Sequence, residues 1–275
     1  MKFHKYQALG NDYLVVDAPF DHAPPAALIR RICDRSLGLG ADGILLGRAS
    51  AQGFALRIFN PDGSEAEKSG NGLRIYARYL WDGGRVKNDS FTVTTPGGAV
   101  SCQVRDQGRT VFVDMGKASF AMAAADAARE TLGECLAVDG QQLRFTAVSM
   151  GNPHCVLHFD SVSPELARRL GPLIETHPRF PNRTNVQFVK VLDRRRIQIE
   201  IWERGAGYTL ASGSSSCAAA AVSVKLGMCD GNVDVTMPGG TLQIGVQTDF
   251  SVSMVGPVAK VAEGMLAGEL LAATT

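Results

Sequence analysis

Short apolar runs separated by turn-forming residues dominate the chain. Val, Ile, Leu and Phe gather in runs of roughly five to eight residues bounded by Gly, Pro, Asn and Asp, which is the pattern of β-strands. The runs expected to form strands are 13–18, 43–49, 54–60, 90–95, 155–160, 185–192, 197–203 and 232–237. The chain is therefore expected to consist mainly of strands joined by tight turns.

Four segments break this rhythm with apolar residues at helical spacing. They cover residues 24–36, 70–84, 163–177 and 216–227. The second and the fourth are apolar on nearly all sides, and each follows a Ser-Gly pair, at Ser69 and Ser212. A helix that is apolar all round is buried, so these two are expected to be central helices, each wrapped by a strongly curved sheet.

The same motifs occur twice. "GNDYLVVD" from residue 10 matches "GNPHCVLHFD" from 151, "GADGILLG" from 40 matches "RTNVQFVK" from 183, "SGNG" from 69 matches "SGSS" from 212, and "VTTPGGAV" from 93 matches "VTMPGGTL" from 235. The offsets are 141, 143, 143 and 142 residues, and chance matches would not keep this register. The last pair predicts two hairpins with an architectural role.

An internal duplication is therefore predicted. The expected fold class is α+β, with two pseudo-symmetric domains, each a barrel-like, strongly curved sheet around a central helix. The predicted domains are residues 1–117 and 118–275, and the tail 263–275 is expected to pack back on the first domain.

Composition limits the function. A chain of 275 residues with 45% hydrophobic content can fill two cores, and its dispersed charges leave a net charge of +1. This balance argues against a nucleic-acid or membrane partner and favours a small molecule. No apolar run is long enough for a signal peptide or a membrane span, so a cytoplasmic location is expected. The six cysteines lie far apart without CxxC pairs, so they are interpreted as packing residues, with neither disulfides nor a metal site.

Each Ser-Gly pair places a helix start where backbone N–H groups can bind an anion. If the two starts face each other across a cleft between the duplicated halves, their ligand should carry a carboxylate. Ser69 and Ser212 would then flank the carbon that these donors hold. Such a geometry suits removal of a proton on one face and its return on the other.

Five motifs together resemble the diaminopimelate epimerase family. They are "GNDY", "RIFNPDGSEAEKSGNGLR", "MGNPHCV", "RTNVQFV" and "ERGAGYTLASGSSSCAAAA", which stand in the family's order and spacing over nearly the whole chain. The resemblance implies a cofactor-independent isomerase of lysine biosynthesis, formed by two similar domains and assembled as a homodimer. It also implies that two cysteines act as thiolate base and thiol acid on opposite faces of the substrate α-carbon.

The chain departs from that family at the reacting positions. Ser69 and Ser212 stand where the family has its two cysteines, Tyr208 stands where it typically has Glu, and Lys68 where it commonly has an apolar residue. A serine hydroxyl titrates roughly five or more units above a thiol, which corresponds to about 7 kcal/mol. A helix N-terminus contributes only about 0.3–2 kcal/mol. Two-thiol racemisation should therefore be nearly abolished unless another group is the base.

The origin of the serine pair stays open between three explanations: a laboratory change, a decayed relative without activity, and a divergent member with related chemistry. Three functions stay open as well. They are an isomerase at an amino-acid α-carbon, a one-base isomerase or lyase of the same superfamily, and a carboxylate-binding protein without turnover.

Site residues are assigned from the resemblance and from the helix starts. The catalytic candidates are Ser69, Ser212, Glu203 and His154. The candidates for substrate binding are Asn11, Asn60, Gly70, Asn71, Asn152, Asn185, Glu203, Arg204, Gly213 and Ser214. Asn60 and Glu203 each lie nine residues before a serine, so the repeat makes them equivalent.

Each assignment has a plainer alternative. A lone Asn commonly caps a turn, and a Glu-Arg pair is commonly a surface ion pair. His154 could orient a catalytic side chain or act as base, and it could equally be a packed, hydrogen-bonded histidine. Tyr208 could donate a proton or fill space left by a smaller substrate, and filling is favoured. Cys217 is expected to lie in the core.

Overall fold

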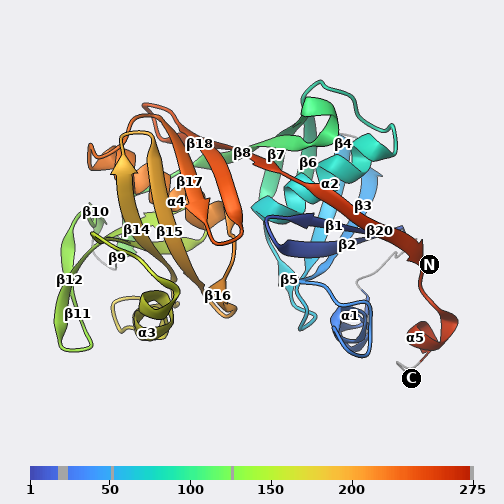
Figure 1. Ribbon diagram of the computed structural model, residues 1–275, viewed down its shortest axis with the longest axis horizontal. Coiled ribbons are helices and arrows are strands. Elements are labelled where there is room, and N and C mark those ends of the chain that lie inside the picture. Colours follow the sequence, from blue (N-terminus) through green and yellow to red (C-terminus); the bar gives the residue numbers. More distant parts are fainter. Residues whose placement is uncertain (18–23, 51–52, 125–126, 273–275) are drawn as a thin grey trace. The chain divides into compact units, whose positions relative to one another are not determined.

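A computed structural model describes residues 1–17, 24–50, 53–124 and 127–272 (Figure 1). The chain forms two compact units, which are described separately below. Unit 1 consists of Met1–Val113 and Gly256–Thr275, and unit 2 of Asp114–Val255. The division predicted at residues 117 and 118 stays a prediction. The predicted tail also includes residues 273–275, which lie outside the described residues.

Unit 1 is built on one sheet whose neighbouring strands follow a fixed order. From one edge to the other these are β20 (Ala259–Met265), β1 (Lys2–Ala8), β2 (Asn11–Asp17), β3 (Ile44–Ser50), β4 (Gly53–Phe59), β6 (Phe91–Thr95), β7 (Gly98–Arg105) and the first part of β8 (Thr110–Lys117). The pairs β2–β3 and β4–β6 are parallel, and the others are antiparallel. A parallel pair needs a crossover, which α1 (Ala26–Cys33) and α2 (Gly70–Asp82) provide.

Unit 2 repeats this scheme. Its strands follow the order β11 (Glu134–Val138), β12 (Gln141–Ser149), β13 (Pro153–His158), β14 (Asn185–Asp193), β15 (Arg196–Glu203), β17 (Asn232–Met237), β18 (Gly240–Val246) and β19 (Ser251–Pro257). The parallel pairs are again the third and the fifth, and the crossover helices are α3 (Pro164–Glu175) and α4 (Gly213–Lys225). Identical pairing in both units is what a duplication predicts, and the α+β fold class is confirmed.

The remaining elements are short. In each unit a short strand pairs with one end of the fifth strand. These short strands are β5 (Glu65–Ala66), which pairs with β4, and β16 (Gly207–Thr209), which pairs with β15. A separate hairpin is formed by β9 (Ala121–Ala124) and β10 (Ala127–Glu130), and the chain also has the 3₁₀ turn η1 (Asp106–Gly108) and α5 (Gly268–Ala272).

Backbone conformation repeats at matched positions. Gly10 and Gly151 have φ of 86° and 93°, and Gly40 and Arg183 have φ of 69° and 59°. Positive φ favours glycine, yet Arg183 adopts it at the position that matches Gly40. The offsets of 141 and 143 residues therefore match positions with the same backbone shape as well as similar sequence.

Helices α2 and α4 are the central helices of their units, as predicted. Helix α2 contacts β1, β2, β3 and β7, and α4 contacts β12, β13, β14, β15, β17 and β18 (Figure 1). Every residue of α4 from Ser215 to Ser223 is buried, and Cys217 lies in the core as expected. The sheet passes close to α2, because a Cβ added at Gly47 would meet the Tyr76 ring at 2.1 Å. No helix of the described residues is long and apolar enough to cross a bilayer.

Candidate active site

The two serines predicted at the site begin the two central helices. Ser69 is the N-cap of α2 with φ −140° and ψ 120°, and Ser212 is the N-cap of α4 with φ −144° and ψ 124°. Their hydroxyls accept hydrogen bonds from the backbone N–H groups of Gly72 at 3.1 Å and Ser215 at 3.5 Å. Serine is a preferred N-cap because its oxygen satisfies an N–H that the helix leaves without a partner. The serines therefore have a local structural role whatever their chemistry.

Both helix starts keep the geometry of an anion site. The first amides of a helix lie outside its hydrogen-bond ladder, and the helix dipole favours a negative charge there. These amides belong to Gly70 and Asn71 in α2 and to Gly213 and Ser214 in α4. They are the groups that the sequence predicted to hold a carboxylate.

In unit 2 the predicted residues meet at one end of the sheet. Asn152 precedes β13 and Asn185 begins β14. Glu203 ends β15, which runs antiparallel to β14, so all three lie at the same end of the sheet. Ser212 Oγ donates a hydrogen bond to Glu203 Oε2 at 3.0 Å. Burial raises the pKa of the Glu203 carboxyl, and the hydrogen bond from the Ser212 hydroxyl offsets part of that rise. A carboxylate and a serine hydroxyl thus form a direct pair at the start of α4.

His154 is buried in a hydrogen-bonded chain. It is 1% exposed, its Nδ1 lies 3.1 Å from Gln187 Nε2, and its Nε2 lies 2.9 Å from Asn152 Oδ1. The Gln187 nitrogen only donates, so Nδ1 accepts and the proton is on Nε2, which donates to Asn152. Burial lowers the pKa of His154 to about 3. The imidazole is neutral, and both of its nitrogens are engaged.

Gln187 also reaches the start of α4. The same amide nitrogen donates to Ser215 Oγ at 3.0 Å. Sequence reasoning missed Gln187, although it stands two residues after Asn185 and so faces the same side of β14. Strand alternation is the signal that could have found it.

Asn185 and Arg204 are hydrogen-bonded to each other. Asn185 Nδ2 donates to the Pro153 carbonyl at 2.9 Å, and its Oδ1 accepts from the Arg204 backbone N–H at 3.0 Å. The Arg204 guanidinium donates to the Asn182 carbonyl at 3.3 Å. Asn185 therefore fixes the turn after β15, and substrate contact by Asn185 stays a prediction.

In unit 1 the predicted residues form a second network. Asn71 Nδ2 donates to Asn11 Oδ1 at 2.9 Å, and Asn11 Nδ2 donates to Asp42 Oδ2 at 2.9 Å. The fully buried Arg74 donates to Asn71 Oδ1 at 2.8 Å. Sequence reasoning missed Asp42, although the offset of 143 residues makes it equivalent to Asn185. Asn60 lies apart from this network and donates to Ser64 Oγ at 3.0 Å.

Basic side chains form ion pairs with Asp42 of the unit 1 network and with its neighbour Asp12. Arg35 lies 2.7 Å from Asp12 and 2.8 Å from Asp42, and Lys5 lies 2.8 Å from Asp12. Burial alone would raise the pKa of Asp12, but hydrogen bonds from Arg35 and Lys5 outweigh it and lower that pKa. Asp12 is therefore held ionised, and Asp42, which shares Arg35 with it, accepts the hydrogen bond that holds the Asn11 side chain.

Tyr208 is held by a glutamate and an arginine that do not belong to the predicted site. Its hydroxyl donates to Glu200 Oε2 at 2.7 Å, and the Arg168 guanidinium of α3 lies 4.2 Å from its ring centroid. Burial, followed by Glu200, raises its pKa to about 12. The favoured interpretation, that Tyr208 fills space left by a smaller substrate, stays a prediction.

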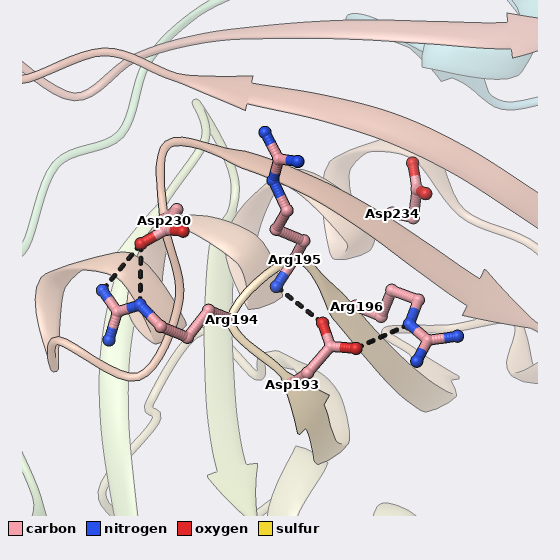
Figure 2. Close-up of a pocket in the computed structure, with 6 residues that line it drawn as sticks. All are labelled: Asp193, Arg194, Arg195, Arg196, Asp230 and Asp234. Atoms are coloured by element: carbon pink, nitrogen blue, oxygen red, sulfur yellow. Dashed lines mark hydrogen bonds and ion pairs between the residues drawn. The ribbon is translucent and has the colours of Figure 1, made fainter.

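A shallow pocket lies at the other end of the unit 2 sheet. It encloses about 490 Å³ between the β14–β15 turn and the start of β17 (Figure 2). Arg194 pairs with Asp230 at 2.7 Å, and Arg196 pairs with Asp193 at 2.7 Å. Because its arginines are largely neutralised by aspartates, this pocket has little attraction for an anion. Among the described residues, no three His, Cys, Asp or Glu side chains are grouped to hold a metal ion.

Solved structures place this fold with amino-acid epimerases and racemases. A hydroxyproline epimerase from Agrobacterium vitis, crystallised with trans-4-hydroxy-L-proline, superposes with a TM-score of 0.71 at 15% identity, covering 96% of this chain and 91% of that one. At this identity the likeness shows the fold alone. The described fold is thus shared with that protein, and a serine-capped helix lies at the centre of each unit.

Sequence comparison gives the family. The family model of diaminopimelate epimerase matches residues 3–121 and 146–261. Diaminopimelate epimerase 2 of Nostoc sp. is 54% identical over 283 residues, with 100% of this chain and 99% of the relative covered. Diaminopimelate epimerase of Stutzerimonas stutzeri is 42% identical over 275 residues, with 97% and 99% covered. The chain belongs to the diaminopimelate epimerase family and is an isomerase-family enzyme.

Proposed function

We propose that this enzyme transfers a proton at the α-carbon of an amino acid that carries a second carboxylate, with Glu203 as the proton acceptor. The observation that carries the proposal is the 3.0 Å hydrogen bond between Ser212 Oγ and Glu203 Oε2 at an anion-binding helix start. Glu203 can take the proton that a serine hydroxyl cannot, because a raised carboxyl pKa makes it a stronger base than an ordinary glutamate. Ser212 holds the carboxylate in position and keeps a hydroxyl beside the reacting carbon.

The substrate class follows from the helix starts and from the family. The amides of Gly70 and Asn71 at the start of α2, and those of Gly213 and Ser214 at the start of α4, favour a carboxylate. The relatives are named for diaminopimelate, which is an amino acid with two carboxylates. We therefore propose 2,6-diaminopimelate as substrate, with a place in lysine biosynthesis, with Asn11, Asn60, Asn152, Asn185 and Arg204 as further contacts, and without a cofactor.

The two helix starts are chemically unequal. Nine residues before Ser212 stands Glu203, and nine residues before Ser69 stands Asn60. An amide cannot accept a proton at neutral pH, so the α2 side lacks the base that the α4 side has. We propose one efficient proton acceptor, and hence exchange of the α-hydrogen that is faster than inversion. His154, neutral and hydrogen-bonded at both nitrogens, is proposed to position Asn152.

Hydrogen exchange in heavy water tests this proposal. We expect the protein to exchange the α-hydrogen of L,L-2,6-diaminopimelate, followed by mass spectrometry, with slower formation of the meso isomer. Glu203→Gln should reduce exchange by about 100-fold or more, in the range typical of losing an acid–base group. Glu130→Gln, which removes an exposed carboxylate of unit 2 paired with Lys225, should leave exchange unchanged. Exchange that survives Glu203→Gln would rule out Glu203 as the base, and calorimetric binding without exchange would indicate a carboxylate-binding protein.

Restoring both thiols is the complementary experiment. Ser69→Cys with Ser212→Cys should raise the inversion rate more than either change alone, because inversion needs a group on each face. Chiral chromatography of the product measures this. If the folded double variant inverts no faster than the unchanged protein, the pocket is not arranged for two-base chemistry. The proposed homodimer is tested separately by light scattering.

A further inference from the structure

The two residues that flank Glu203 and Arg204 are held by one buried carboxylate. Glu175 is the last residue of α3 and is 4% exposed. Its Oε2 accepts a hydrogen bond from Trp202 Nε1 at 2.7 Å, and its Oε1 accepts one from the Gly205 backbone N–H at 2.8 Å. Glu175 therefore binds the residue directly before Glu203 and the residue directly after Arg204.

One face of α3 is shaped for this contact. Arg168, Gly171 and Glu175 are spaced by three and four residues, so they lie on the same side of the helix. A Cβ added at Gly171 would lie 2.5 Å from Trp202 Cγ, so the indole packs against the helix where a side chain is lacking. The indole N–H then reaches Glu175 one turn further along.

The turn after β15 is fixed at two successive amides. The Arg204 N–H is bound by Asn185 Oδ1, and the Gly205 N–H by Glu175 Oε1. Gly205 has φ of 80°, which glycine adopts without strain. Arg183 lies 2.5 Å from Glu175 Oε1 and compensates its buried charge.

The equivalent turn of unit 1 is closed by its own residues. Gly63 N–H donates to the Asn60 carbonyl at 2.9 Å, and Ser64 N–H donates to Asp62 Oδ1 at 2.8 Å. Helix α1 contributes Arg30, which donates to the Asp62 carbonyl at 3.0 Å. A carboxylate from a neighbouring helix thus distinguishes the unit 2 turn, which follows the proposed base, from the equivalent turn of unit 1.

We propose that Glu175 is a positioning residue for Glu203 and Arg204. It sets the end of β15 through Trp202 and the turn through Gly205, so the direction of both intervening side chains depends on it. Charge-assisted bonds are strong enough to hold such a turn in one geometry. The functional meaning of this clamp rests on the proposed function, since Glu203 and Arg204 are assigned there.

The clamp itself is tested by NMR without any ligand. Glu175→Gln keeps the shape of the side chain but replaces one carboxylate oxygen with an NH₂ group. This group is a hydrogen-bond donor and faces the N–H of Trp202 or Gly205, which is also a donor, so one of the two bonds is lost. We expect the Trp202 indole or Gly205 amide resonance to move, and hydrogen exchange at Gly205 to become about tenfold faster or more. Glu130→Gln should change neither. If Glu175→Gln fails to fold, Trp202→Phe removes one donor and keeps a ring, and it should also speed exchange at Gly205.

Calorimetry with L,L-2,6-diaminopimelate tests the consequence for the site. Glu175→Gln should weaken binding by about tenfold or more, the effect expected from losing one charge-assisted hydrogen bond. Arg183→Gln leaves both clamp bonds in place and should weaken binding less. Unmoved resonances, or moved resonances with unchanged affinity, would overturn the proposal. If the unchanged protein binds no diaminopimelate, the proposed function fails, and the resonances and exchange at Gly205 still decide whether Glu175 holds the turn.

Discussion

At the residue scale, two helix starts with the same backbone geometry differ in the side chain that supports them. Ser212 is hydrogen-bonded to Glu203, and Ser69 has Asn60 at the equivalent position in sequence. Both serines cap their helices, so the cap alone says nothing of catalysis. The acid–base chemistry proposed for the α4 start depends on the half-buried Glu203 carboxylate, whose pKa is raised by desolvation. The proposed reacting group is thus the carboxylate beside Ser212 rather than the serine hydroxyl.

The buried His154 makes stability depend on pH. Its folded pKa of about 3 lies below the ordinary value of 6.5, so the unfolded state binds more protons between these values. The contribution of His154 to stability should therefore rise with pH across this window and be constant above it, with a loss of about 2–3 kcal/mol from pH 7 to pH 4.5. Urea unfolding at several pH values measures this.

The matched variant is His154→Gln, which should flatten part of that slope. His158 acts in the same direction, because burial lowers its pKa to about 4, so some slope remains. Asp12, whose pKa is lowered, loses its contribution only below about pH 4, outside the compared range. An unchanged slope in the variant would show that His154 is not held neutral.

At the element scale, the helices and strands with strong periodicity were predictable and the contacts between them were not. The expected helix over 70–84 is Gly70–Asp82, and the expected strand over 232–237 is Asn232–Met237. The unit 1 strands β1 and β20 were not predicted, because Lys, Gln and Glu interrupt their apolar residues and leave no continuous apolar run. The role of Gln187 and Glu175 depends on which strand neighbours which helix, and this is set by tertiary packing.

The close approach of β3 to α2 is a contact of this kind. A Cβ at Gly47 would lie 2.1 Å from the fully buried Tyr76 ring, so Gly47→Ala must displace the ring or the strand. We expect a loss of about 1–3 kcal/mol, the usual cost of overpacking, measured by chemical unfolding. Gly268→Ala, where nothing lies within 4 Å of the added carbon, should be close to neutral. Equal stabilities of the two variants would contradict the packing described for α2.

At the scale of the whole molecule, one pairing scheme occurs twice and the chain returns to its first unit at the end. The constant offset predicted the duplication because each copy keeps its turns, including positive φ at matched positions. The site was predictable in part for the same reason: the serines, Asn11 and Glu203 stand in repeated motifs. Positions such as Glu175 lie outside the motifs, and their role follows only from the fold. The segment after residue 256 belongs to unit 1 through β20, which pairs with β1.

This return of the chain gives a test that separates the units. Leu266 is buried in the unit 1 core with Phe3 and Leu14, so Leu266→Ala should cost about 2–5 kcal/mol. The chain has two tryptophans, Trp81 in unit 1 and Trp202 in unit 2, so fluorescence of each single-tryptophan variant reports on one unit. Leu266→Ala should lower the urea midpoint reported by Trp81 and change that reported by Trp202 less. Met265→Ala, at a side chain that is 69% exposed, should change neither by more than about 0.5 kcal/mol. If only the midpoint reported by Trp202 shifted, Leu266 would stabilise unit 2, and this would contradict its place in the unit 1 core.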